Sequence, residues 1–225
     1  MIRAILFDFD GTVADTISAL QEGVNRTMRR YGFPEHTYED ILDFVNHGAR
    51  DLIRRSMPEA LREDEELIDR VFADYNRDYE QVYLLTDHAY DGVAELIARL
   101  HGQGYRIGVL SNKQDRFVKG LCAAVLQEGS YDAAQGMVAG QPGKPHPYLA
   151  EKISAELGVL PQECIMIGDS DVDVATAENA GMTHVGVTWG FRSEAFLREH
   201  GATNVARTPE ELEMLIAALS QKQAE

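Results

Sequence analysis

The sequence has few cysteines, few basic residues and no long apolar run. Its 225 residues include two cysteines, Cys122 and Cys164, which lie far apart in apolar surroundings. Disulfide frameworks and zinc sites need more ligands at closer spacing, so we expect two buried free thiols. The histidines are scattered along the chain and suggest no metal cluster.

Basic charge is scarce relative to acidic charge. Lysine and arginine number 21 against 37 acidic residues, and the formal net charge is −16. Nucleic-acid binders carry a basic surface and anionic membranes disfavour an acidic one, so neither is an expected partner. An anionic small molecule entering such a protein needs local positive charge at its binding site.

Long apolar runs are absent, since none approaches the ~20 residues that cross a bilayer. The N-terminal residues 1–8 are typical of a strand and unlike a signal peptide, because the apolar stretch is short and acidic residues follow at once. We therefore expect a cytoplasmic protein. Its expected assembly state is a monomer or a homodimer.

Four short apolar runs predict buried parallel strands, at 4–7, 106–110, 164–168 and 183–187. Amphipathic helical patterns separate them, at 92–100, 114–126, 147–157 and 171–180. This alternation predicts an α/β fold, a doubly wound (Rossmann-like) parallel sheet with helices on both faces.

Residues 16–85 interrupt the alternation with helical patterns at 17–31, 38–45, 49–56 and 65–84. This predicts a small all-helical cap domain, 16–85, inserted after the first strand of a discontinuous core formed by 1–15 and 86–225. The insert follows the carboxyl end of the first strand, where open α/β sheets bind ligands, so the cap is a candidate lid.

Polar residues directly follow three of the predicted strands. They are Asp8 and Asp10, Ser111 and Asn112, and Asp169 and Asp173, while Lys144 lies in a loop rich in glycine and proline. Loops at the carboxyl ends of the strands of a doubly wound sheet converge on one edge. The sequence therefore predicts one site assembled from distant segments.

Asp8 and Asp10 are two residues apart on an extended chain, so their side chains point to the same side. Such close carboxylates repel unless a cation lies between them, and Mg²⁺ prefers oxygen ligands. Asp169 is a natural third ligand, and Asp173 is one helical turn further on. These four acids are the candidate magnesium ligands.

The remaining candidates suit a phosphoryl group. Lys144 offers a positive charge, and Ser111 and Asn112 offer hydroxyl and amide donors. Gly11 allows close approach of the backbone, and Thr12 precedes the next helix. These five residues are the candidate substrate-binding residues.

Four segments, in order, resemble the motifs of the haloacid dehalogenase superfamily. They are Asp-Phe-Asp-Gly-Thr-Val at 8–13, Ser-Asn-Lys at 111–113, Gly-Lys-Pro-His-Pro at 143–147 and Gly-Asp-Ser-Asp-Val-Asp at 168–173. The resemblance covers nearly the whole chain, and the helical insert matches the cap that follows the first motif in that superfamily.

The resemblance implies a Mg²⁺-dependent phosphatase with Asp8, Asp10 and Lys144 as catalytic residues. Asp8 would attack phosphorus and become an aspartyl phosphate, while Asp10 would act first as acid and then as base. The magnesium ion would be held by the Asp8 carboxylate, the Asp10 backbone carbonyl and Asp169.

Within the superfamily, Asp10 separates this chain from the dehalogenases, which lack an acid two residues after the nucleophile. The glycine before Asp169 resembles the phosphatases, whereas the β-phosphoglucomutase group usually has glutamate there. The segment 111–118 and the Lys-Pro-His-Pro run resemble the phosphoglycolate phosphatase group, so the expected substrate is a small phosphorylated metabolite, 2-phosphoglycolate.

Several alternatives share the same core. They are a pyrophosphatase or nucleotide phosphatase, a β-phosphoglucomutase-like phosphomutase, and a binding module without turnover. The cap loop 46–49 is less glycine-rich than in the phosphoglycolate phosphatase group. We expect substitutions at His47 or Arg50 to shift substrate preference, although His47 also suits a capping or surface position.

Overall fold

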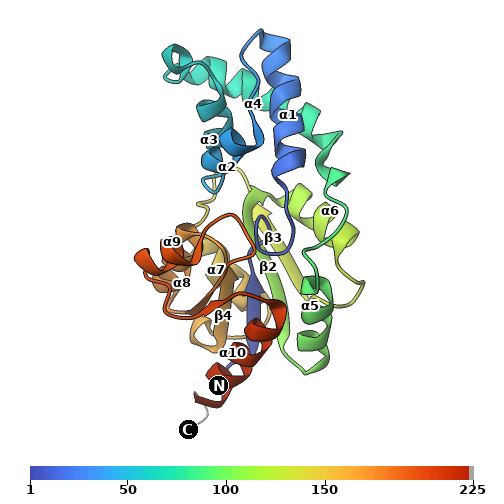
Figure 1. Ribbon diagram of the computed structural model, residues 1–225, viewed down its shortest axis with the longest axis vertical. Helices are drawn as coiled ribbons and strands as arrows, with labels where there is room; N and C mark the ends of the chain where they lie inside the picture. Colours follow the sequence, from blue (N-terminus) through green and yellow to red (C-terminus); the bar gives the residue numbers. More distant parts are fainter. Residues whose placement is uncertain (223–225) are drawn as a thin grey trace.

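The computed structural model describes residues 1–222, and their six parallel strands form one sheet (Figure 1). The strand order is β3-β2-β1-β4-β5-β6. The strands are β1 (Ala4–Phe7), β2 (Arg106–Gln114), β3 (Ala133–Met137), β4 (Cys164–Gly168), β5 (Thr183–Val187) and β6 (Val205–Ala206). From β1 the chain first adds β2 and β3 on one side of the sheet and then adds β4, β5 and β6 on the other side. Doubly wound sheets bind ligands at this switch point, outside the carboxyl ends of β1 and β4.

Helices cover both faces of the sheet because alternate residues of each strand point to opposite sides. Ile5 and Phe7 pack with α5 (Val93–Gly102), α6 (Asp115–Val125) and α10 (Pro209–Lys222). Ala4 and Leu6 pack with α7 (Tyr148–Glu156) and α8 (Asp171–Ala180). All four β1 side chains are fully buried, and each large one contributes about 1.5–3 kcal/mol to stability. The predicted doubly wound α/β fold is confirmed.

Four helices between β1 and α5 form a separate layer at one end of the molecule (Figure 1). They are α1 (Ile17–Tyr31), α2 (Tyr38–Phe44), α3 (Ala49–Ser56) and α4 (Glu65–Glu80), with short 3₁₀ helices at Glu59–Leu61 and Tyr83–Leu85. Their apolar faces share one hydrophobic cluster, which Phe117 of α6 joins. The helical layer therefore rests on the α/β core through α6.

Local signals explain where these helices begin and end. α1 ends at Gly32, whose φ of 68° is the left-handed conformation that glycine adopts without strain. α2 begins with a capping box in which Thr37 and Asp40 exchange side-chain and backbone hydrogen bonds. The insert is thus helical for reasons that are visible in its own sequence.

The structure adds elements that the apolar runs did not predict. β3 has the sequence Ala-Ala-Gln-Gly-Met, which lacks the β-branched residues typical of strands. β6 has only two residues, and α9 (Glu194–Glu199) and α10 were not predicted either. β2 continues to Gln114 instead of ending at residue 110, and its pairing with β3 is irregular between Leu110 and Gln114.

Two further expectations concern single features of the chain. Cys122 and Cys164 are buried and free, as predicted. Within the described range, 1–222, no helix is both long and apolar enough to cross a membrane.

Candidate active site

Asp8 and Lys144 form a buried ion pair at the carboxyl end of β1. The Lys144 ammonium lies 2.8 Å from one Asp8 carboxylate oxygen and 2.7 Å from an Asp173 oxygen. The side chains of Lys144 and Asp8 are only 3% and 7% exposed. An ammonium buried this deeply is stable only beside anions. Asp8 and Asp173 therefore hold Lys144 in place, and Lys144 points at the carboxylate that the sequence predicts to be the nucleophile.

The loop that carries Lys144 is fixed by Asn112 at the end of β2. The Asn112 side-chain amide donates to the Lys144 carbonyl (2.8 Å), and its oxygen accepts from the Lys144 backbone N–H (2.7 Å). The same amide donates to the backbone carbonyl of Asn46 in the helical layer (3.0 Å). Asn112 was predicted to bind substrate, and in this structure its hydrogen bonds position the Lys144 loop.

Asp10 lies beside Asp8 but has its own set of partners. One of its oxygens is 2.9 Å from the Lys113 ammonium and accepts a hydrogen bond from the Thr16 hydroxyl. The other oxygen accepts from the Ser111 hydroxyl at 3.0 Å. Burial raises the pKa of Asp10, but Lys113 and the hydrogen bonds from Thr16 and Ser111 outweigh it and lower the pKa overall.

Three buried carboxylates, Asp8, Asp169 and Asp173, offer oxygens that lie within 4.8 Å of one another. Asp169 accepts hydrogen bonds from the Phe191 backbone N–H (2.7 Å) and the Thr12 hydroxyl (3.3 Å). Both Asp173 oxygens have partners, because one contacts Lys144 and the other closes the capping box of α8 with Ser170. The Asp10 carboxylate is outside this cluster, so of the four predicted magnesium ligands three lie together through their side chains.

The cluster carries more negative charge than its single cation neutralises. Burial raises the pKa of Asp8 well above its usual value, and Asp173 raises it further while Lys144 lowers it. Burial and Asp173 together raise the pKa of Asp169 to about 7. A divalent cation beside these oxygens would favour their ionised forms, so the donor set fits an oxygen-seeking ion such as Mg²⁺.

Gly11 lies directly against the cluster. Its φ is 80°, and a Cβ atom there would lie 2.4 Å from an Asp169 carboxylate oxygen and 2.8 Å from the Phe191 ring. Only glycine satisfies both the left-handed conformation and this close approach. Gly11 and Thr12 were predicted to bind substrate, but they support Asp169 and are not among the residues that line the cavity described next.

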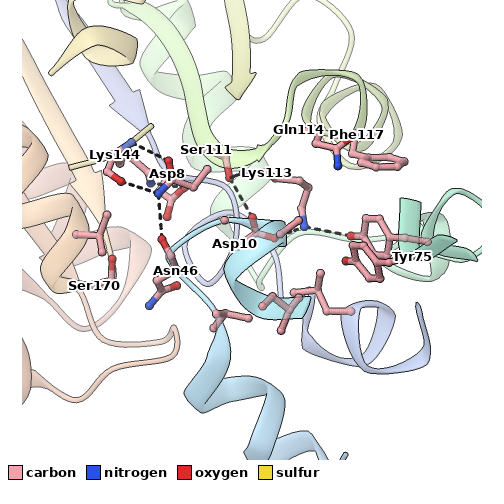
Figure 2. Close-up of a pocket in the computed structure, with 18 residues that line it drawn as sticks. Asp8, Asp10, Asn46, Tyr75, Ser111, Lys113, Gln114, Phe117, Lys144 and Ser170 are labelled. Atoms are coloured by element: carbon pink, nitrogen blue, oxygen red, sulfur yellow. Dashed lines mark hydrogen bonds and ion pairs between the residues drawn. The ribbon is translucent and has the colours of Figure 1, made fainter. Parts of the chain in front are cut away.

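A cavity opens above Asp8 between the sheet edge and the helical layer (Figure 2). The core contributes polar side chains, among them Asp8, Asp10, Ser111, Lys113 and Lys144. The helical layer contributes mainly apolar and aromatic side chains from α1, α3 and α4, and from the loop before α3. They are Leu20, Ala49, Leu52, Tyr75 and Tyr79 in the helices, and Val45, Asn46 and Gly48 in the loop. The polar side chains of the cavity thus come mainly from the α/β core, and the side chains of the helical layer that face them are mainly apolar.

Lys113 is a residue of the cavity to which the sequence analysis gave no role. Its ammonium lies 2.9 Å from an Asp10 oxygen and 3.1 Å from the Tyr79 hydroxyl of α4. Figure 2 shows the Lys113 ammonium beside Asp10. Residues 111 and 113 point to the same side of a strand, which is how Ser111 and Lys113 both reach Asp10. A predicted strand that continued past residue 110 would have placed Lys113 on the same face as Ser111, and this would have indicated Lys113 as a site residue.

The two cap residues expected to influence substrate preference do not line the cavity. His47 is exposed. The Arg50 guanidinium is 2.7 Å from both Glu65 and Asp69, in a pair of largely exposed salt bridges. The geometry instead brings Asn46, Tyr75 and Tyr79 to the cavity from the helical layer.

Comparison with known proteins relates this geometry to characterised families. Residues 5–187 match the model of the haloacid dehalogenase-like hydrolase family. A phosphoglycolate phosphatase from Vibrio vulnificus is 30% identical over 216 residues, which cover 93% of this chain and 90% of the relative. The pyrophosphatase PpaX of Bacillus cereus is 28% identical, with 88% and 89% of the two chains covered.

A solved structure shows the same fold over nearly the whole chain. It comes from Lactobacillus delbrueckii subsp. bulgaricus and is provisionally named a phosphoglycolate phosphatase. It is 32% identical, with a TM-score of 0.87, and the match covers 95% of this chain and 98% of that one. With its sheet order, its helical layer and its cluster of acids around Lys144, the chain belongs to the haloacid dehalogenase-like hydrolase family.

Proposed function

We propose that this protein is a Mg²⁺-dependent phosphatase that hydrolyses a small phosphomonoester through an aspartyl phosphate on Asp8. The observation that carries the proposal is the position of Asp8, which lies at the cavity floor and contacts the Lys144 ammonium at 2.8 Å. A carboxylate beside a fixed cation is arranged to attack an anionic phosphoryl group, because the cation reduces the repulsion between them.

The metal would be held by the Asp8 carboxylate, the Asp10 backbone carbonyl and the Asp169 carboxylate. When bound, Mg²⁺ supplies charge neutralisation for the phosphoryl oxygens. Asp173, whose oxygens already contact Lys144 and Ser170, supports the site by fixing Lys144. The raised pKa values of Asp8 and Asp169 are the observation that favours a cation here.

The chain's own residues supply the remaining steps. An Asp8 oxygen attacks phosphorus while Lys144 binds a phosphoryl oxygen. Asn112 holds the loop that carries Lys144, and the Ser111 hydroxyl turns from Asp10 to a phosphoryl oxygen when the substrate binds. Asp10 donates a proton to the leaving oxygen as the bond between this oxygen and phosphorus breaks. Asp10 then takes a proton from a water molecule, and this water attacks the aspartyl phosphate and releases inorganic phosphate and free Asp8. The charge of a bound phosphoryl group opposes the effect of Lys113 and favours the protonated form of Asp10 in the first step.

The proposed substrate is 2-phosphoglycolate. It is supported by the names of the Vibrio relative and of the Lactobacillus structure. The Bacillus relative, a pyrophosphatase, supports the alternative in which pyrophosphate occupies the same site. A nucleotide phosphatase and a phosphomutase are distinguished by the products that they release, and a binding module without turnover releases none.

We also propose that residues 16–85 act as a movable cap over the core formed by 1–15 and 86–225. The helical layer has its own hydrophobic cluster and closes the cavity from one side. A substrate must pass between the two parts, so cap opening is expected to accompany binding. Hydrogen exchange of the α1–α4 amides with and without a bound phosphate analogue tests this, and unchanged exchange would contradict it.

A cytoplasmic location is part of the proposal. It is supported by the two buried free thiols, which suit a reducing compartment. Fractionation of the source cells tests it, and recovery of the protein outside the cytoplasm would contradict it.

The test of the activity is phosphate release from a panel of substrates. The panel contains 2-phosphoglycolate, pyrophosphate, nucleoside monophosphates, sugar phosphates and p-nitrophenyl phosphate, each with MgCl₂ and with EDTA. We expect magnesium-dependent release with a preference for 2-phosphoglycolate. A preference for pyrophosphate would move the assignment to the alternative, and no release from any compound would contradict the phosphatase.

Replacing Asp10 by asparagine removes the proposed proton donor while keeping the shape of the side chain. We expect kcat for 2-phosphoglycolate to fall about 10²–10⁴-fold, with a smaller change in phosphate affinity. The loss should be smaller for p-nitrophenyl phosphate, whose leaving group needs little protonation. Steady-state kinetics on both substrates measure the difference, and unchanged turnover would rule out an acid/base role.

A further inference from the structure

Lys113 is a buried cation on the cavity wall. Among the described residues that line the cavity, Lys113 and Lys144 are the only lysines or arginines. Lys144 is committed to Asp8 and Asp173, so it is placed for the phosphoryl group. Lys113 is the remaining positive charge that a bound anion can contact.

The hydrogen bonds of Lys113 leave capacity for such a contact. An ammonium has three N–H donors. In the described part of the chain Lys113 has two side-chain acceptors, Asp10 at 2.9 Å and the Tyr79 hydroxyl at 3.1 Å. Its side chain is 6% exposed. A third donor on a buried lysine that borders a cavity is a binding group for a ligand oxygen.

The position of Lys113 relates it to the leaving side of the substrate. Asp10 is the proposed proton donor to the leaving oxygen, and Lys113 contacts Asp10 directly. When the Asp10 oxygen that contacts Lys113 also protonates the leaving oxygen, the leaving oxygen and the Lys113 ammonium are separated by at most about 6 Å, the length of two hydrogen bonds end to end. An acidic group one atom removed from the leaving oxygen falls within reach of Lys113.

We propose that Lys113 is the specificity-determining residue of this site and binds an anionic group on the leaving side of the substrate. The inference rests on the proposed phosphatase function and deepens it. The anionic group is the carboxylate of 2-phosphoglycolate, and in the pyrophosphatase alternative the second phosphoryl group would occupy the same place. Tyr79 connects Lys113 to the cap, because its hydroxyl accepts a hydrogen bond from Lys113 while its ring is part of the cap's hydrophobic cluster.

The test compares substrates that differ mainly in the carboxylate. 2-Phosphoglycolate and 2-hydroxyethyl phosphate are assayed with the wild-type protein, with Lys113→Met and with Lys119→Met. Lys119 is a matched control because its side chain is 59% exposed on α6 and pairs with Asp115. We expect Lys113→Met to lower the preference for 2-phosphoglycolate, as a ratio of kcat/KM values, by about 10- to 100-fold. Lys119→Met should leave that ratio unchanged.

The outcomes separate this inference from the proposed function. Equal losses on both substrates in Lys113→Met would show that Lys113 acts only through Asp10, and the inference would be wrong while the phosphatase stands. A 2-phosphoglycolate preference that is retained would overturn it too. Pyrophosphate is assayed with the same three proteins, and a loss in Lys113→Met with this substrate but not with 2-phosphoglycolate would show that the recognised anion is the second phosphoryl group and that the carboxylate assignment is wrong. No phosphate release by the wild-type protein would overturn both claims.

A measurement on the wild-type protein covers the case in which Lys113→Met fails to fold. Glycolate and ethylene glycol are compared as inhibitors of p-nitrophenyl phosphate hydrolysis. We expect glycolate to inhibit competitively at concentrations where ethylene glycol has no effect. Equal inhibition by the two compounds, or none by either, would contradict an anion-binding group on the leaving side.

Discussion

Asp8→Asn is expected to abolish turnover, with kcat lowered by roughly 10⁴-fold or more, because the variant has no carboxylate to accept the phosphoryl group. Asparagine has nearly the same shape, and Lys144 keeps its contact with Asp173. The fold should therefore persist. Initial rates of phosphate release measure the loss, and far-UV circular dichroism confirms the fold.

The matched control for this variant is Asp91→Asn, which changes an exposed aspartate outside the cavity. It should have the activity of the wild-type protein. If Asp8→Asn kept more than a tenth of the wild-type rate, direct attack of water on the substrate would replace covalent catalysis as the mechanism.

Asp169→Asn is expected to stabilise the protein at alkaline pH in EDTA while removing its activity. Burial and Asp173 raise the pKa of Asp169 from 3.8 to about 7. Because the folded state binds this proton more tightly, the stabilising contribution is complete below pH about 4 and is lost as pH rises through about 7. At pH 8 the ionised group costs the folded state about 2–4 kcal/mol, and asparagine removes that cost.

Magnesium should reduce or remove this difference in stability between the two proteins, because it stabilises only the wild-type protein. A ligand at 100 times its dissociation constant adds about 2.7 kcal/mol to the free energy of unfolding, and this gain requires the ligands of the site. We expect MgCl₂ to raise the melting temperature of the wild-type protein and to have little effect on Asp169→Asn. Thermal unfolding at pH 8 in EDTA and in MgCl₂ measures both effects.

Two results would contradict this account of the acidic cluster. One is a lower melting temperature of Asp169→Asn than of the wild-type protein in EDTA at pH 8. The other is an equal response of the two proteins to MgCl₂. Asp91→Asn serves again as the control, since an exposed aspartate should change neither the pH dependence nor the response to magnesium.

The α/β fold could be predicted from the sequence because its central strands are continuous apolar runs. β1 and β4 are fully buried along their whole length, and their apolar runs of four and five residues are too short for a buried helix. β3 was missed because it consists mainly of small residues. Gly136 in that strand lies so close to the Lys113 carbonyl that a Cβ atom would be 2.4 Å from it, and only tertiary packing explains this choice of residue.

The site residues that lie in loops just after a strand could be predicted from the sequence, whereas a site residue that lies within a longer strand than expected could not. The sequence placed Asp8, Asp169 and Lys144 at one edge of the sheet, and the structure brings these residues together. Lys113 was missed because residues 111–113 were interpreted as a loop before a helix that begins at residue 114. In the structure residues 111–114 extend β2 past an irregularity in its pairing. The cap residues at the cavity, such as Tyr79, depend on how the helices pack, which the helical periodicity alone does not fix.

Covalent catalysis by this site requires that Asp8 carry the phosphoryl group during turnover. The most direct measurement is mass spectrometry of peptides from the protein after acid quenching within a single turnover of 2-phosphoglycolate with MgCl₂. We expect the added mass of one phosphoryl group on the peptide that contains Asp8, its loss on treatment with hydroxylamine, and its absence from Asp8→Asn. Wild-type protein that releases phosphate without ever carrying this modification would contradict the claim.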